Sequence, residues 1–513
     1  MRAPLLLVFG FALAVAPAAT IVSCSSGSSS TSTADGGGSD ATPFDGAPDA
    51  APDDASFTDA SDAADAGDAG HDSSSGDSGS PYPLRASVNG RYLATQQGAP
   101  FLLTGDAPQA LIANVSLADA KTYFADRAAL GFNAGWVNLL CDTYTAGNAD
   151  GTTFDGLVPF VTPDGGAVTA DQYDITQPNE TYFARVDAMV EIAAQYGIVV
   201  FLDPIETGGW LATLRNDGLA AATTYGTYVG NRYSKYDNIV WQSGNDFQSW
   251  MTASDDALVA AVATAIKKAD PRHLQTVELS YNNSSSTDDP TWVPIVGLDA
   301  AYTYYPTYAQ VLHSYNRTTQ QPVPVFLVES TYDNENLVIG HTATTQDLRR
   351  EEYWTLLSGG TGLLYGNHYT WTFTAGWQQN LDTPGAHQIA YLRSFFTTRK
   401  WQDLVPDQNH KVVTAGYGTF DGNQDPFDTS DYVTTAKTAD GALAVSYLPT
   451  GGTVTVDMSQ LTGTITARWY DPSAGTYAAI TGSPFPNQGT QMFASPDNNE
   501  DGDPDWVLVL EGQ

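Results

Sequence analysis

Two hydrophobic runs of this chain each end on a carboxylic acid. Residues 238–246 read Asn-Ile-Val-Trp-Gln-Ser-Gly-Asn-Asp, and residues 323–329 read Val-Pro-Val-Phe-Leu-Val-Glu. Runs of this kind are typical of strands that are buried on both faces. Two carboxyl groups that face each other can act as proton donor and nucleophile in the cleavage of a glycosidic bond. The pattern therefore points to Asp246 and Glu329 as a catalytic pair.

This chemistry needs the two acids in different protonation states. Asp246, as the acid, must stay protonated near neutral pH, which requires burial or a nearby negative charge. Glu329, as the nucleophile, must stay ionised, and Asn245 (through the sugar 2-hydroxyl) and Tyr304 are candidate donors to it. The alternative for either acid is a buried carboxylate bonded to backbone, but finding two such acids favours the catalytic interpretation.

Other polar and aromatic residues lie at or after the ends of predicted strands. A carboxylate or amide there can bind sugar hydroxyls, although core hydrogen bonding is an equal alternative for Asp106 and Asp203. An indole can stack on a sugar face, although packing under a loop is the alternative for a single tryptophan. The predicted substrate-binding residues are Asp106, Asn138, Asp203, Trp210, Asn245, Tyr304, Asn367, His368 and Trp371.

Signatures of metal or cofactor chemistry are weak. The seven histidines are scattered without a His-Glu-x-x-His run, and no Gly-x-Ser-x-Gly motif occurs. Residues 497–502 (Asp-Asn-Asn-Glu-Asp-Gly) resemble the start of a calcium loop, but Leu508 stands where a glutamate is needed, so a solvated acidic turn is favoured. We expect no metal ion and no cofactor.

The acids must be positioned by a repeating scaffold. Helix-like segments alternate with predicted strands near residues 101–106, 132–140, 198–203, 238–246, 274–279, 296–304, 323–329 and 362–368. Eight such units over roughly 300 residues match a (β/α)8 TIM barrel, in which strand C-termini form one catalytic rim. A doubly wound open sheet is the competing architecture, but no Gly-rich phosphate loop follows the first strand.

The pattern changes after about residue 409. Short strands near residues 442–447, 452–457, 464–470 and 506–510 are separated by glycine- and proline-containing turns. This spacing predicts a small C-terminal β-sandwich over residues 409–513, behind a catalytic barrel over residues 85–408.

The N-terminal residues predict export. Arg2 precedes an apolar stretch at residues 5–15, and residues 21–24 (Ile-Val-Ser-Cys) resemble a bacterial lipobox, so residues 1–24 are expected to be a signal peptide with Cys24 lipidated. An ordinary signal peptide cleaved near Ala18 or Ala19 is the alternative. Residues 25–84, rich in Asp, Ser, Gly and Ala, predict a disordered tether. The expected location is the bacterial cell envelope, anchored by lipid at the outer membrane, or secretion.

Charge and cysteine content narrow the classes further. The net charge of -37 disfavours nucleic acid and charge-driven binding of anionic polysaccharides. With Cys24 acylated, only Cys141 remains, and its position at the end of an apolar run predicts a buried, inert thiol. Neither property predicts an oligomeric state.

The residues around the two acids resemble the apiosidase-like glycoside hydrolases, glycoside hydrolase family 140 and its relatives. The matching stretches are residues 101–106, 131–133, 183–187, 241–246, 324–329 with Tyr332, 359–362, 365–366 and Trp371. Residues 467–472, Gly475 and residues 505–510 resemble the domain that usually follows, named for collagen binding in a collagenase.

The resemblance implies a retaining barrel with the acid/base after strand four and the nucleophile at the end of strand seven, the positions of Asp246 and Glu329. Most relatives in the wider clan carry Asn-Glu after strand four, whereas this chain has Asn245-Asp246, the form usual for the apiosidase-like branch. The known substrate type of the family is the apiose-containing side chain of pectin.

Two functional hypotheses follow. The first is a surface-tethered glycoside hydrolase acting on plant or other complex polysaccharide. The second is a non-catalytic cell-surface protein that binds carbohydrate or matrix. In both, the membrane is reached only through the lipid anchor.

Overall fold

The computed structural model describes residues 80–162, 166–167, 169–281, 283–336, 340–421 and 427–513. The predicted signal peptide with Cys24, and the tether up to residue 79, lie outside the described residues. No helix within the described ranges combines the length and apolar character needed to cross a bilayer.

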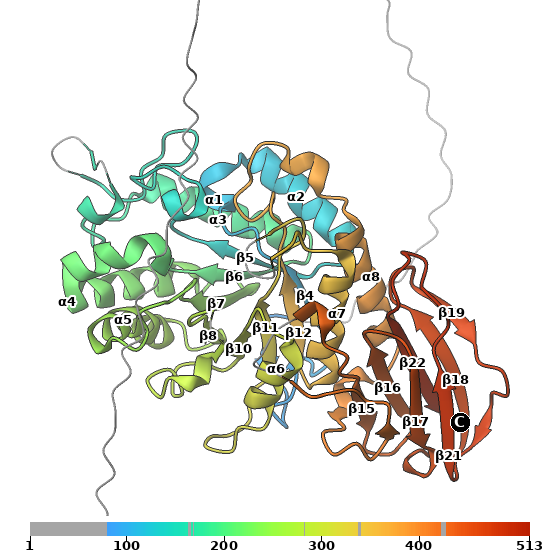
Figure 1. The fold of residues 1–513 in the computed structure, drawn as a ribbon. Coiled ribbons are helices and arrows are strands. Elements are labelled where there is room, and N and C mark those ends of the chain that lie inside the picture. The colour runs from blue at the N-terminus through green and yellow to red at the C-terminus, as the bar shows by residue number, and fades with distance from the viewer. Residues whose placement is uncertain (1–79, 163–165, 168, 282, 337–339, 422–426) are drawn as a thin grey trace, which may run out of the picture. The chain divides into compact units, whose positions relative to one another are not determined.

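Eight parallel strands form a TIM-like barrel, as predicted (Figure 1). Neighbouring strands pair in the order β8-β7-β6-β5-β4-β12-β11-β10. Their bounds are β4 (Leu103–Asp106), β5 (Ala134–Asn138), β6 (Val199–Asp203), β7 (Ile239–Ser243), β8 (Gln275–Val277), β10 (Asp299–Tyr302), β11 (Val325–Glu329) and β12 (Gly362–Tyr365). A small antiparallel sheet of β1 (Arg85–Ala86), β2 (Leu93–Ala94) and β3 (Pro100–Phe101) precedes them.

One seam interrupts the strand ladder, between β8 and β10. The short strand β9 (Ser284–Ser285) runs antiparallel along β10 there. The hydroxyl of Ser286 spans the seam. It donates to the backbone carbonyl of Val277 at 2.5 Å and accepts from the amide of Ala300 at 2.9 Å. Side-chain bonds thus replace part of the backbone pairing that a fully closed barrel would have.

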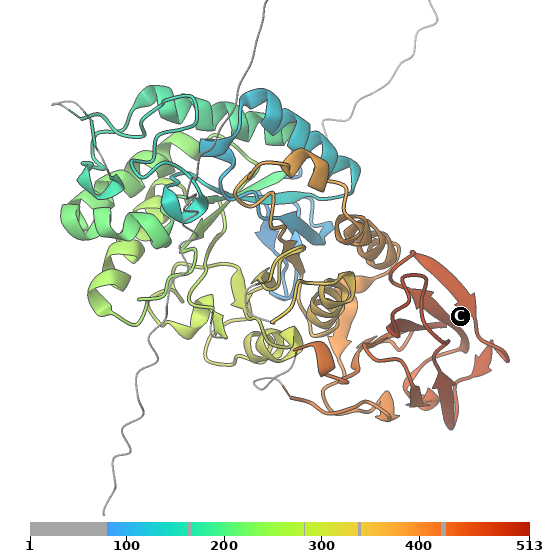
Figure 2. The ribbon, with the colours of Figure 1, turned by 45° about the horizontal axis from the view of Figure 1, so that its top comes forward.

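Helices surround the strands in Figures 1 and 2. Two of them begin at capping side chains: Ser116 accepts from the amide of Asp119, and Asn179 accepts from that of Thr181. The helix bounds are α1 (Leu111–Asn114), α2 (Leu117–Ala129), α3 (Glu180–Gln195), α4 (Thr207–Tyr233), α5 (Ala253–Ala269), α6 (Thr307–Tyr315), α7 (Thr345–Leu357) and α8 (Pro384–Thr397). Helix α4 is broken at Gly218, where φ is 79°.

Alternation along each strand divides the barrel side chains between two cores. Phe201, Phe326 and Val328 belong to the cluster inside the barrel, whereas Val200 and Leu202 pack in the outer cluster under the helices. Successive residues of a strand point to opposite faces, so both faces must be apolar. This double burial is the reason why the strands appear in the sequence as continuous hydrophobic runs.

The C-terminal part is an antiparallel β-sandwich, also as predicted. The larger sheet has the order β13-β15-β16-β22-β18-β19, with β20 paired to β18, and the smaller has the order β14-β17-β21. The bounds are β13 (Leu404–Pro406), β14 (Val413–Ala415), β15 (Thr434–Thr438), β16 (Leu443–Leu448), β17 (Thr453–Asp457), β18 (Thr464–Asp471), β19 (Thr476–Ala479), β20 (Phe485–Pro486), β21 (Thr490–Ala494) and β22 (Trp506–Gly512).

The larger sheet of the sandwich packs against the barrel helices α7 and α8. Tyr353 of α7 stacks on Tyr447 of β16 with ring centroids 5.1 Å apart, and Phe395 of α8 lies 4.6 Å from Tyr470 of β18. These residues belong to one buried cluster that draws on both folds. The sheet is therefore buried on both faces, and the sandwich shares a hydrophobic core with the barrel.

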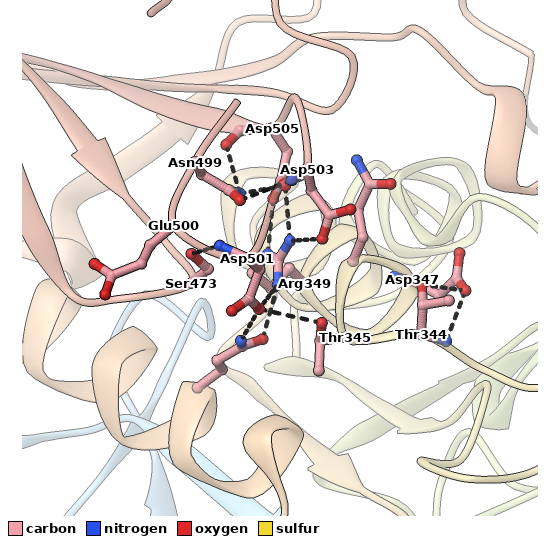
Figure 3. Close-up of polar contacts among 12 residues, drawn as sticks. Thr344, Thr345, Asp347, Arg349, Ser473, Asn499, Glu500, Asp501, Asp503 and Asp505 are labelled. Carbon is pink, nitrogen blue, oxygen red and sulfur yellow. Dashed lines mark hydrogen bonds and ion pairs between the residues drawn. The ribbon is translucent and has the colours of Figure 1, made fainter. Parts of the chain in front are cut away.

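The acidic loop 497–505 lies at this junction and binds an arginine of α7 (Figure 3). Arg349, fully buried, donates to both carboxylate oxygens of Asp505 at 2.9 and 2.8 Å, to Asp503 at 2.8 Å and to Asp501 at 3.2 Å. Asn499 donates to Asp505 at 2.8 Å. Residues 497, 498 and 500–502 are exposed, as the predicted solvated turn requires, whereas Asn499 is buried. Asp505, which lies beyond the predicted turn, is buried beside Arg349.

Candidate active site

A strained turn carries Asp246 beyond the end of β7. The strand ends at Ser243, and Gly244, Asn245 and Asp246 follow with φ of 109°, 69° and 53°. Only glycine adopts the left-handed region freely, so the two non-glycine residues must be held there by their surroundings. Glycine is also required at 244 for space, because a Cβ there would lie 2.1 Å from the carbonyl oxygen of Glu278.

Three neighbouring strands hold this turn in place. From the end of β5, Asn138 donates to the side-chain oxygen of Asn245 at 2.9 Å. From the start of α4, after β6, the hydroxyl of Thr207 lies 2.8 Å from the backbone oxygen of Asn245. From beyond β8, the carboxylate of Glu278 accepts from the amide of Asp246 at 2.8 Å. The position of Asp246 therefore depends on contacts that only the assembled barrel provides.

Tyrosines join Asp246 to Glu329, which ends β11. The phenol oxygen of Tyr302 lies 2.8 Å from an oxygen of Asp246 and 2.8 Å from an oxygen of Glu329. Because both contacts share the phenol oxygen, the two carboxyl oxygens lie no more than twice 2.8 Å apart. The two acids therefore face each other at close range. Tyr144 donates to the other oxygen of Asp246 at 2.8 Å.

Glu329 contacts three phenols, whereas Asp246 contacts two phenols and the side-chain amide of Gln248, which donates to it at 3.2 Å. Tyr304 donates to one oxygen of Glu329 at 2.7 Å, and Tyr332 donates to the other at 2.7 Å. Gly366 makes room for the Tyr332 ring, because a Cβ there would lie 2.1 Å from it. Tyr302 carries one proton and can donate to only one of its two carboxyl neighbours. If that neighbour is the ionised Glu329, Asp246 must supply the proton of the other contact.

Burial dominates the electrostatics of the site. Burial raises the pKa of Asp246 above its ordinary value. Burial, and then the charge of Asp246, raise the pKa of Glu329 to about 8, while its three phenol donors act in the opposite direction. No lysine, arginine or histidine in the described ranges forms an ion pair with either acid. The pair is therefore built to keep a proton near neutral pH.

Of the predicted substrate-binding residues, four lie at this site. Asn245 belongs to the turn itself and Asn138 supports it, so both act on the position of Asp246. Tyr304 contacts Glu329 directly. Trp371, half-buried, packs on the cluster inside the barrel to which Tyr332 also belongs. Its partly exposed indole and Tyr304 are the predicted aromatic residues available to a sugar at the barrel mouth.

The other predicted residues are not brought to the acids. Asp106 is fully buried and accepts from Tyr123 at 2.5 Å and from Arg127 at 2.6 Å, so its bonding is satisfied in the core. Asn367 is also buried, where it accepts from the amide of Tyr369 at 2.9 Å. For these two residues, core hydrogen bonding replaces the predicted contacts to sugar hydroxyls.

Three more predicted residues have surroundings of their own. Trp210 is fully buried and stacks on Tyr173, so its indole presents no face to a sugar. His368 is exposed, and its Nδ1 atom lies 3.8 Å from a carboxylate oxygen of Glu335. Its charged partner is thus Glu335 and neither Asp246 nor Glu329. Asp203 is buried at the end of β6, where one oxygen accepts from the amide of Ile205 at 3.0 Å and the other has no partner. Burial raises the pKa of Asp203 to about 8.

Sequence reasoning missed Tyr144, Tyr302, Tyr332 as a ligand of Glu329, and Glu278. Tyr302 lies two residues before Tyr304 and so shares its strand face, a signal that was present. Glu278 also follows a barrel strand. The rule that selected Asp246 and Glu329, an acid at the end of a strand, therefore selects Glu278 as well. Tyr144 lies in the loop after β5, where no local pattern indicates contact with Asp246.

Comparison with known families and structures gives consistent matches. Residues 87–403 match the model of the family described as "Apiosidase-like, catalytic domain", and residues 422–511 match "Putative collagen-binding domain of a collagenase". A solved structure titled "Glycoside hydrolase" is 21% identical, with a TM-score of 0.70, over 84% of this chain and 97% of that chain. A family 5 glycoside hydrolase from Bacteroides vulgatus ATCC 8482 is 20% identical, with a TM-score of 0.70, over 84% and 93% of the two chains. At these identities the structures establish the fold. No curated protein matches.

Proposed function

The chain belongs to the apiosidase-like family of glycoside hydrolases, and from this we propose that Asp246 is its acid/base, that Glu329 is its nucleophile and that it cleaves with retention. The observation that carries the proposal is the Tyr302 phenol, 2.8 Å from both acids. Retaining glycosidases hold their carboxyl groups about 5–5.5 Å apart, whereas inverting enzymes need about 6.5–9.5 Å. The short bridge through one phenol supports the retaining arrangement.

The proposed reaction has two steps. In the first, Glu329 attacks the anomeric carbon while Asp246 protonates the glycosidic oxygen, so that the leaving sugar departs as an alcohol and a glycosyl ester forms on Glu329. In the second, Asp246 removes a proton from water, the resulting hydroxyl attacks the anomeric carbon, and Glu329 leaves as a carboxylate. Each carboxyl thereby returns to its starting protonation state.

The tyrosines support both steps. Tyr304 and Tyr332 donate to Glu329 and so favour its anion, in opposition to the burial that raises its pKa. When Glu329 becomes an ester it loses its charge, and at the same moment Asp246 becomes a carboxylate. The Tyr302 O–H can then turn from Glu329 toward Asp246, since its oxygen contacts both. One phenol therefore stabilises the negative charge on either side of the first step.

The proposed substrate class is plant or other complex polysaccharide. The family name supports a terminal apiose, and the partly exposed side chains of Trp371 and Tyr304 support stacking on a sugar ring. The lipobox at residues 21–24 and the long acidic spacer support a lipid-anchored enzyme facing external polymers. We propose this location together with the activity.

A release assay tests the proposal. The unmutated protein, Asp246→Asn and Glu329→Gln are incubated with a panel of plant polysaccharides, including pectin fractions, and the liberated sugars are identified by mass. Asp171→Asn and Glu500→Gln, on exposed side chains, are matched controls for the loss of a carboxylate. We expect a released sugar from the unmutated protein and both controls, and losses of about 10³-fold or more in the two active-site variants.

The outcomes separate the parts of the proposal. A free apiose peak supports the family substrate, and another sugar redirects the substrate class while the mechanism stands. Proton NMR of the first product gives its anomeric configuration and therefore distinguishes retention from inversion. Hydrolysis that survives in Asp246→Asn on an ordinary glycoside contradicts the assignment of the acid.

A further inference from the structure

We propose that Glu278 is a positioning residue of this active site, which holds the backbone of Asp246 so that its carboxyl meets the glycosidic oxygen. The inference rests on the proposed role of Asp246 as the acid. Glu278 lies one residue beyond the end of β8. Strand β8 is next to β7, which leads into the turn that carries Asp246. The geometry of the 244–246 turn and of the Glu278 side chain carries the argument.

Backbone contacts first bring Glu278 against the turn. Its amide donates to the carbonyl of Ser243 at 2.8 Å, which continues the pairing of β7 with β8 by one residue. Its carbonyl lies so close to Gly244 that a Cβ on that glycine would be 2.1 Å away. The turn and Glu278 therefore cannot shift independently.

The side chain of Glu278 also bonds to the turn. One oxygen accepts from the amide of Asp246 at 2.8 Å. That amide follows two left-handed residues and belongs to a third, with φ of 53°, a conformation that costs roughly 1 kcal/mol or more for a non-glycine residue. A bond to this amide stabilises the conformation that directs the Asp246 side chain.

The remaining oxygen of Glu278 has an unusual environment. The residue is 0% exposed, and this second oxygen has no hydrogen-bond partner among the described groups. An unpaired buried polar atom costs about 1–3 kcal/mol, which an apolar side chain in the same space would avoid. The presence of a glutamate at this buried position is therefore better explained by its bond to the amide of Asp246 than by packing.

The charges facing Glu278 are all acidic or phenolic. Burial, then the charges of Glu329 and Asp246, raise the pKa of Glu278 well above its ordinary value. Asp203 acts in the same direction, and Tyr302 and Tyr332 are the phenols that interact with it. These influences favour the protonated form of Glu278. A glutamine, which also presents a neutral acceptor at this distance, should replace it.

The test compares Glu278→Gln with Glu278→Met, which has a similar length but no comparable acceptor. Each is assayed on a natural glycoside identified by the polysaccharide panel and on the 2,4-dinitrophenyl glycoside of the same sugar, whose leaving group needs no protonation. We expect Glu278→Met to lose about 10²-fold in kcat on the natural glycoside with KM little changed. On the dinitrophenyl glycoside, azide should restore its turnover, because azide attacks the glycosyl enzyme without a base. Glu278→Gln should stay within about threefold of the unmutated enzyme on both substrates.

Three results overturn the inference. These are full activity of Glu278→Met on the natural glycoside, equal losses on both substrates without azide rescue, and a Glu278→Gln variant as impaired as Glu278→Met. Circular dichroism and thermal melting verify folding. If Glu278→Met does not fold, Glu278→Asp, which keeps the carboxyl but withdraws it by one methylene, must show the same dependence on the leaving group. Activity retained in Asp246→Asn contradicts the proposed function instead, so the two failures are distinguishable.

Discussion

At the domain junction one arginine binds three aspartates, whereas in the candidate active site three carboxyl groups lie together and none forms an ion pair within the described residues. Arg349 donates to Asp501, Asp503 and Asp505 (Figure 3). Asp246 and Glu329 instead contact phenols. An arginine is a permanent cation and can only donate, while a phenol can donate to an anion or accept from an acid. The difference separates carboxylates that hold the fold from carboxyls whose protons can move.

The largest effect that tests this comparison is expected at the junction. Arg349→Met leaves the buried Asp505 without its cation, and breaking such a pair costs about 3–5 kcal/mol. Denaturant unfolding of the variant and the unmutated protein measures the difference. Glu329→Gln, which removes no cation's partner, should lower the unfolding free energy by no more than about 1 kcal/mol. Equal destabilisation by the two changes would show that the comparison is wrong.

Two further strand-end acids sharpen the comparison at a smaller scale. Asp106 is paired with Arg127, so Asp106→Asn should cost about 3 kcal/mol by leaving a buried guanidinium without its anion. Asp203 forms no ion pair among the described residues and has one oxygen without a partner there, so Asp203→Asn should lower stability by no more than about 1 kcal/mol. Thermal and denaturant unfolding check both variants, and the reverse order of the two costs contradicts the rule.

The shared phenol gives the next prediction. Tyr302→Phe removes the donor that both acids contact, so kcat should fall on the order of 10²-fold, while the neighbouring Tyr304 and Tyr332 keep Glu329 hydrogen-bonded. Steady-state kinetics on the dinitrophenyl glycoside measures the change. Tyr144→Phe is a matched control that removes a donor to Asp246 alone. A loss in Tyr302→Phe no greater than in Tyr144→Phe argues against a role on both acids.

The smallest effect is a shift in pH dependence. The charge of Asp246 contributes to raising the pKa of Glu329, so Asp246→Asn should lower that pKa and move the acidic limb of the pH–rate profile to lower pH. Activity on the dinitrophenyl glycoside with azide makes this profile measurable in the variant. An unchanged acidic limb would show that the two carboxyls do not interact.

The raised pKa of Glu329 should also make the stability of the fold depend on pH. The folded-state pKa of Glu329 is raised to about 8, so its protonated form stabilises the fold fully below the unfolded pKa, near 4.3. That contribution is lost as pH rises from about 4 through about 8. Melting temperatures of the unmutated protein should therefore fall relative to those of Glu329→Gln over this window. A constant difference between the two proteins contradicts the shift.

Sequence reasoning succeeded where burial leaves a local pattern. The barrel strands are apolar on both faces, and the helices begin at capping residues such as Ser116 and Asn179, so eight units could be counted before any coordinates. The buried Cys141 follows from the same reasoning. The seam between β8 and β10 could not be predicted, because it depends on the hydroxyl of Ser286 bonding to residues distant in sequence.

At the site, residue type and strand position identified Asp246 and Glu329, but they did not distinguish equivalent strand-end acids. Asp106 and Glu278 both follow hydrophobic runs, yet one is bound by Arg127 and the other faces Asp246. A rule based on strand ends includes both residues. What separates them is that Asp106 pairs with Arg127, whereas Glu278 forms no ion pair among the described residues. Arg127 comes from helix α2, so the pairing depends on the fold.

The sequence by itself determined the family and the barrel followed by a sandwich, because periodicity and short motifs are local properties of the chain. It also predicted Asp246 and Glu329 as the catalytic pair. The tertiary structure decided which phenols surround those acids, that Arg349 binds the acidic loop, and that Glu278 reaches the amide of Asp246. Hydrogen bonds and burial between distant segments depend on distances that exist only after folding. The protonation state of a carboxyl depends on those neighbours, so it is set by the fold.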